Sequence, residues 1–139
     1  MSQSVIMPVT EVCDRWAIAR LKLERIVCNH EKKAMLKAAV EHYAVGIPDS
    51  PEIQTLAEKL YKHHGEQWDV EQAIYEEAKL VPYDADKIAG YSIRVRELNE
   101  IRVALKNQIS RLVDQQEHQD LRSNYGVPQQ RNTVSGQST

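Results

Sequence analysis

A heptad pattern of apolar residues between residues 84 and 119 constrains the fold of this chain more than any other feature. The a and d positions of this pattern are Ile88, Tyr91, Val95, Leu98, Arg102, Leu105, Ile109 and Leu112. Residues three and four apart lie on one face of an α-helix, so the pattern predicts one long helix with a single seam. Such a seam must be buried against other helices, which indicates an all-α fold.

Glycine and proline are rare in this chain, and their positions divide the rest of it. The 139 residues include five Gly and five Pro, which, apart from Gly65 and Gly90, gather near residue 8, between residues 46 and 51, at residue 82 and from residue 126 onward. Residues 10–45 carry an apolar stripe that falters near Asn29, which leaves open one long helix or two shorter ones. Residues 50–78 open with Ser50 and Pro51, a typical N-cap followed by proline at the first helical position. The apolar stripe of residues 10–45 includes Val12, Trp16, Ala19, Leu23 and Ile26, with Thr10 as the expected N-cap.

These segments predict an antiparallel bundle of three or four long helices with short connections. We expect an N-terminal extension over residues 1–9, the helical bundle over residues 10–123 and a polar C-terminal tail over residues 124–139. The tail is rich in Gly, Ser and Gln and has no apolar period. A chain of this composition gains order only against other surfaces, because nothing else offsets its backbone entropy.

Composition excludes several classes of protein. Charged residues make up 27% of the chain, and 18 basic against 20 acidic side chains give a formal net charge of −2. This balance argues against a protein whose main partner is nucleic acid. No apolar stretch is long enough to cross a bilayer and the N-terminus lacks the pattern of a signal peptide, so we expect a cytoplasmic protein. Cys13 and Cys28 are too few for a disulfide framework, and we expect both to be buried thiols.

Polar residues occupy positions in the seams that an idealised bundle would keep apolar. Arg102 lies on the seam of the last helix, with Asn99 and Lys106 one turn to either side. A buried arginine needs an anion, and Asp14 or Glu71 could be its partner. Such residues can form an internal ion-pair network that fixes the register of the helices. Alternatively they can line a pocket between helices that binds an anionic, nucleotide-like small molecule. The candidate ligand-binding residues are Trp68, Glu71, Asn99, Arg102, Lys106, Asp14, Arg25 and His64.

The chain carries none of the motifs that indicate catalysis or a bound cofactor. No glutamate stands three residues before any of the five histidines, as a di-metal bundle site requires, and no paired zinc-type cysteines occur. Glycine-rich phosphate loops and nucleophile elbows are also absent. We therefore expect neither an enzyme nor a metal or cofactor.

Three segments of the chain resemble a family of short helical proteins called domain of unknown function 6165. Residues 10–26, TEVCDRWAIARLKLERI, are similar to its opening "GEL-x-D-K-x-x-I-L-x-x-K-x-x-R-I". Residues 67–74, QWDVEQAI, are similar to "L-W-x-I-E-D-x-I", and residues 99–109, NEIRVALKNQI, to "N-D-x-R-x-x-L-K-x-x-I". The resemblance implies a shared polar seam and no catalytic residue. The matching positions are Asp14, Lys22, Arg25, Trp68, Glu71, Asn99, Arg102 and Lys106.

The chain departs from this family at three positions in or beside the middle segment. Gln72 stands where the family has Asp, His64 where it has Asn, and Tyr75 where it has Arg. These departures put any charge-dependent role of that segment in doubt.

Two functions are consistent with these features. The first is a non-catalytic binding protein whose pocket sequesters or senses an anionic small molecule. The second is a structural subunit, for example of a virus particle, whose C-terminal tail becomes ordered against neighbouring subunits. Both predict a homo-oligomer, because so long and thin a bundle would leave apolar side chains exposed.

Overall fold

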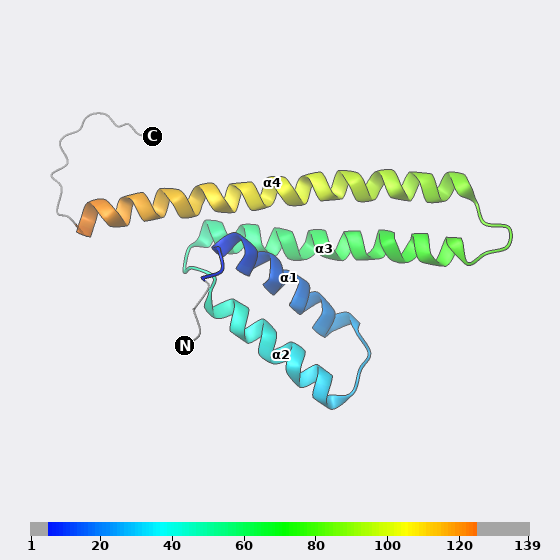
Figure 1. The fold of residues 1–139 in the computed structure, drawn as a ribbon, viewed down its shortest axis with the longest axis horizontal. Coiled ribbons are helices and arrows are strands. Elements are labelled where there is room, and N and C mark those ends of the chain that lie inside the picture. The colour runs from blue at the N-terminus through cyan, green and yellow to red at the C-terminus, as the bar shows by residue number, and fades with distance from the viewer. Residues whose placement is uncertain (1–5, 125–139) are drawn as a thin grey trace.

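The computed structural model describes residues 6–124 of the chain, and the side chains among them up to residue 118. It contains four helices and, in this part of the chain, no strand, which confirms the all-α prediction (Figure 1). The helices are α1 (Val9–Arg25), α2 (His30–Val45), α3 (Pro51–Ala78) and α4 (Ala85–Asn124). Most of the predicted polar tail, residues 125–139, lies outside the described residues.

The chain forms two helices, not one, between residues 10 and 45. Helix α1 ends at Arg25, and Ile26 has an extended backbone. The side chain of Asn29 then caps α2 by accepting a hydrogen bond from the backbone N–H of Lys32 at 2.9 Å. The predicted cap at Thr10 is wrong, because α1 already begins at Val9 and the Thr10 hydroxyl lies 2.7 Å from that of Ser110 on α4.

Helices α3 and α4 form a long antiparallel hairpin. Ser50 caps α3 as predicted, and Pro51 is its first residue. At the start of α4, the Asp84 carboxylate accepts hydrogen bonds from the backbone N–H groups of Asp86 and Lys87. Helix α4 continues five residues beyond the predicted end at Gln119.

Helix α1 lies between the α3/α4 hairpin and α2. It packs against both helices of the hairpin, whereas α2 packs against α1 alone among the described helices. The side of α1 that faces the hairpin core carries Cys13 and Ala17. The apolar stripe predicted from the sequence is divided between the two sides. Ala19 lines a groove with side chains of α2, and a Cβ at Gly46, the C-cap of α2, would lie 3.0 Å from Cγ1 of Val12, whereas Trp16 packs against the core. Helix α1 is therefore covered on two sides, which a single stripe did not reveal.

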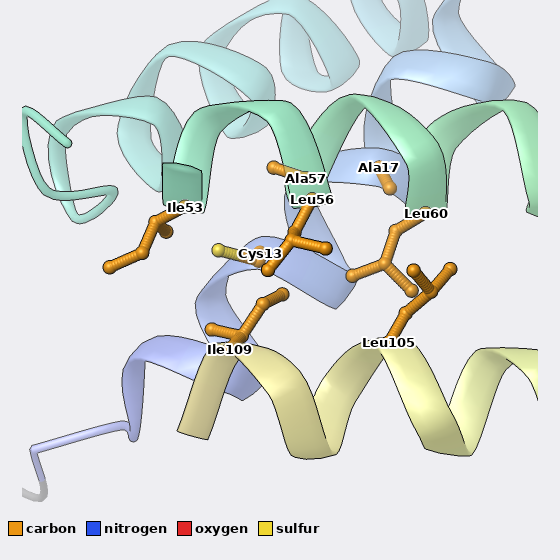
Figure 2. Packing of buried hydrophobic residues seen from close by; sticks show 8 residues of the cluster. All are labelled: Cys13, Ala17, Ile53, Leu56, Ala57, Leu60, Leu105 and Ile109. Carbon is orange, nitrogen blue, oxygen red and sulfur yellow. The ribbon is translucent and has the colours of Figure 1, made fainter. Parts of the chain in front are cut away.

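The hydrophobic core lies where α1 crosses the hairpin. Figure 2 shows side chains of α3 and α4 pointing toward one another, with α1 closing the cluster. Full burial of a leucine or isoleucine contributes about 1.5–3 kcal/mol, so this cluster supplies much of the stability of the fold. The eight residues are Cys13, Ala17, Ile53, Leu56, Ala57, Leu60, Leu105 and Ile109.

Burial divides the hairpin into two parts. We call residues 66–97, which run from the middle of α3 to the first third of α4, the distal half, and the part covered by α1 the proximal half. No residue of the distal half is buried. Figure 1 shows why, because α3 and α4 run on together past the end of α1.

Candidate functional site at Asp14

Asp14 lies at the centre of a polar cluster inside the proximal half. Its residue is 3% exposed, because it follows Cys13 on the side of α1 that faces the hairpin. Arg102 of α4 binds this carboxylate with two nitrogens. Its Nη2 lies 2.7 Å from Oδ2 and its Nε lies 3.2 Å from Oδ1. A bidentate pair of this kind fixes both the distance and the orientation of the two helices.

Two further side chains complete the cluster. The Nε2 of His64 on α3 lies 2.8 Å from Oδ1 of Asp14 and donates to it, because an ionised carboxylate can only accept. The Nζ of Lys106 lies 4.0 Å from Oδ2 of Asp14 and 2.8 Å from Oε2 of Glu11. Asp14 thus connects α1 to both helices of the hairpin.

The electrostatics of the cluster favour an ionised Asp14. Burial by itself raises the pKa of this carboxyl group, but hydrogen bonds and charge from His64 and Arg102 outweigh it and hold the pKa far below its usual range. The hydrogen bond to Asp14 raises the pKa of the Arg102 guanidinium. Lys106 is in turn paired with Glu11. The cationic groups of the cluster therefore already have anionic partners within the chain.

The structure shows which carboxylate pairs with Arg102. Of the two candidates, Asp14 binds it, whereas Glu71 is exposed and accepts only a 3.4 Å hydrogen bond from Gln67 among the described residues. Asp14, His64, Arg102 and Lys106 are the predicted site residues that the structure brings together. The interpretation as an internal ion-pair network fits this geometry.

The other predicted site residues lie outside the Asp14 cluster. Arg25 ends α1 and pairs with Asp69, its Nη1 2.5 Å from Oδ1. Its guanidinium also lies over the ring of Trp68, 5.8 Å from the centroid. Asn99 is exposed on α4, one turn before Arg102. Whether these residues bind a ligand stays a prediction.

Glu11 is a member of the cluster that the sequence reasoning missed. Its carboxylate lies in the first turn of α1, where it also complements the helix dipole. Its spacing of three residues from Asp14 places both carboxylates on one face of α1. That spacing was the available signal.

Two further polar residues of α3, His63 and Gln67, have different environments. The Nε2 of buried His63 donates to the backbone carbonyl of Leu98 at 2.5 Å. The Oε1 of Gln67 is buried without a hydrogen-bond partner in the described part of the chain. Gln67 stands at the boundary between the two halves of the hairpin, where the seam is no longer fully paired.

A face with aromatic side chains continues beyond the end of α1. On α3 this face contains Trp68, Glu71 and Tyr75, which follow His64 at helical spacing. On α4 it contains Tyr91 and Val95, which precede Arg102 at helical spacing. We call these five residues the distal face. Trp68, Tyr91 and Val95 are half-buried, and Tyr75 is 58% exposed. This is the side of the hairpin that α1 covers in the proximal half.

A groove with two basic residues lies between α1 and α2. Its volume is about 280 Å³. Arg15 and Lys22 are exposed at its edge. The other basic residues of α1's second half, Arg20 and Arg25, pair with glutamate or aspartate, but among the described residues no carboxylate lies within 4.0 Å of Arg15 or Lys22. The groove is otherwise lined by Ile18, Ala19, Leu36, Ala39 and Tyr43.

The two cysteines are both free thiols. Cys13 is buried as predicted, and burial together with the neighbouring Asp14 charge raises its pKa to about 11. A thiol with such a pKa is a poor nucleophile near neutral pH, because little thiolate forms. The prediction for Cys28 is wrong, since this residue lies in the loop after α1 and is only half-buried.

Neither a cluster of metal ligands nor a membrane-spanning helix occurs in the part of the chain that the structure describes. There, no three His, Cys, Asp or Glu residues gather as metal ligands would. None of the helices, so far as they are described, is long and apolar enough to cross a membrane.

Comparison with known proteins adds no relative from which a role could be carried over. No family model, curated protein or solved structure matches the chain, so the resemblance to domain of unknown function 6165 stays a prediction.

Proposed function

We propose that this protein is a non-catalytic helical protein that acts by assembling with copies of itself. The distal face is the observation that carries the proposal. In this proposal the Asp14 cluster is a structural clamp that holds α1 on the hairpin. The proposal follows the assembly interpretation of the sequence, of which the virus-particle setting stays a prediction.

The distal half has the properties of an unfilled interface. A two-helix hairpin offers each helix only one neighbour, so one side of every seam residue stays open to water. Of the aromatic residues of the distal face, Tyr75 is exposed, and Trp68 and Tyr91 are half-buried. Tryptophan and tyrosine are enriched at the centres of protein interfaces, where they bury large areas at low entropic cost. A second chain on this face would cover the hairpin as α1 covers the proximal half.

The Asp14 cluster supports the clamp more than the pocket. An anionic ligand at Arg102 would have to displace the Asp14 carboxylate, which would then remain buried with fewer partners. Leaving a buried charge unpaired costs several kcal/mol, so the binding of such a ligand would be weakened by a free energy of that size. The anionic-ligand pocket remains a prediction that this geometry does not favour.

Sedimentation velocity of the full chain at a series of concentrations tests the proposal. We expect a defined oligomer at micromolar concentration. Replacing Tyr75→Arg puts a positive charge in place of the exposed aromatic ring of the distal face and should shift the chain to monomer. The matched control is Ile93→Arg, since Ile93 is also half exposed on the distal half but lies on the opposite side of α4 from Val95. This control should assemble like the native chain.

A monomeric native chain at all concentrations would refute the proposal. Native mass spectrometry of untagged protein distinguishes the assembly proposal from the ligand-binding alternative. A ligand-free oligomer supports assembly. Bound small-molecule mass that disappears in Lys106→Ala, with helicity unchanged, would favour the pocket instead.

A further inference from the structure

We infer that the distal face of one copy binds the α1/α2 groove of a second copy, with Glu71 placed against Lys22 and Arg15. This inference rests on the proposed self-association and names the two surfaces that meet. It also excludes the simplest alternative, in which two distal faces pair with each other.

Charge complementarity is the first argument. Between residues 15 and 37 the chain has seven Lys or Arg and two Glu, whereas residues 66–78 contain five Asp or Glu and no Lys or Arg. Four of these five carboxylates pair with Lys or Arg inside the chain, which leaves Glu71. Glu71 has no cationic group within 4.0 Å among the described residues, as Arg15 and Lys22 have no carboxylate. Each surface thus holds unpaired charge that the other can neutralise. Two distal faces in contact would instead bring one acidic α3 against another.

The apolar parts of the two surfaces are also complementary. Trp68 and Tyr75 are seven residues apart, so they lie two turns apart on one face of α3 with Glu71 between them. The groove places Leu36 and Tyr43, likewise seven residues apart on α2, beside the basic pair. An acidic helix with an aromatic stripe is the kind of partner that fits an apolar groove with a basic edge.

The positions of the two surfaces allow a closed dimer. The guanidinium of Arg25 at the end of α1 lies over Trp68, and Lys22 is one turn earlier on α1, so groove and distal face adjoin along the molecule. A two-fold axis relating two copies would place the distal face of each copy on the α1/α2 groove of the other. The lengths agree, because residues 66–78 extend about 20 Å as a helix and the 16 residues of α2 about 24 Å.

Charge reversal with mixing tests the inference on the full chain. In a symmetric dimer Lys22→Glu opposes like charges at both contacts, and so does Glu71→Lys. Each variant alone should raise the dimer dissociation constant about tenfold or more. An equimolar mixture should recover most of the native affinity. One contact of the mixed dimer is native, and in the other the Lys22–Glu71 pair is reversed, with the unchanged Arg15 as the one remaining like charge. Lys33→Glu is the matched control, because Lys33 is exposed on α2 and does not line the groove.

The outcomes separate this inference from the proposed function. If both single variants dimerise like the native chain, or if their mixture does not recover affinity, the inference is wrong. Assembly that is lost in Tyr75→Arg would then still support the proposed function through another surface. Carbodiimide cross-linking of mixed isotope-labelled and unlabelled protein gives an independent readout, and we expect a Lys22–Glu71 link between differently labelled copies. Links within one copy only would contradict the model.

Discussion

The proximal and distal halves of the α3/α4 hairpin have the same secondary structure and a continuous seam, yet they differ in how that seam is covered. In the proximal half, α1 buries Leu60, Leu105 and Ile109 and brings Asp14 to Arg102. In the distal half the same two helices continue, but no third helix of the described residues covers them, and none of residues 66–97 is buried. The comparison shows that a heptad pattern defines a seam, whereas the neighbours around it determine how much stability that seam provides.

The largest expected difference between the two halves concerns their carboxylates. Asp14→Ala should destabilise the chain by about 3 kcal/mol or more, because it leaves Arg102 and His64 partly buried without their acceptor. Asp69→Ala removes the exposed partner of Arg25 and should cost at most about 1 kcal/mol. Urea unfolding followed by circular dichroism measures both changes. Equal losses would mean that the clamp contributes no more than a surface ion pair.

Acid sensitivity should also be concentrated in the proximal half. The pKa of Asp14 is lowered in the folded chain, so its contribution is fully present above the unfolded value of about 3.9 and is lost as the pH falls below it. The native chain should therefore lose free energy of unfolding between about pH 5 and pH 2. Asp14→Asn should show a smaller loss over the same range, although it is less stable at neutral pH. Parallel pH profiles for the two chains would contradict this assignment.

The smallest expected effect compares one glycine from each half. A Cβ at Gly90 would meet no heavy atom within 4 Å, so Gly90→Ala should stabilise the chain by about 1 kcal/mol through helix propensity alone. At Gly65 a Cβ would lie 3.3 Å from Nη2 of Arg25 and 3.7 Å from Cδ1 of Leu21, so α1 must adjust. Gly65→Ala should therefore gain less, as measured by thermal unfolding. A larger gain at Gly65 would show that α1 does not pack closely there.

Much of the fold could be predicted from local patterns. The seam of α4, the cap and proline that open α3 and the turn near Pro82 all follow from residue spacing and helix-end chemistry, which act within a few residues. The covered side of α1 could not be predicted in this way. Cys13 and Ala17 are small, so a pattern of large apolar residues such as Val12 and Trp16 does not mark them, although both are fully buried in the core.

The sequence by itself determined that this chain is all-α, where most of its helices begin and end, and that Arg102 needs an anionic partner. Only the tertiary structure decided that Asp14 rather than Glu71 is this partner, that residues 10–45 form two helices, and that α1 ends before the hairpin does. The physical reason is the distance along the chain over which each kind of interaction acts. Caps and helical periods depend on neighbours along the chain, whereas the choice between two carboxylates 57 residues apart depends on which helix packs over Arg102.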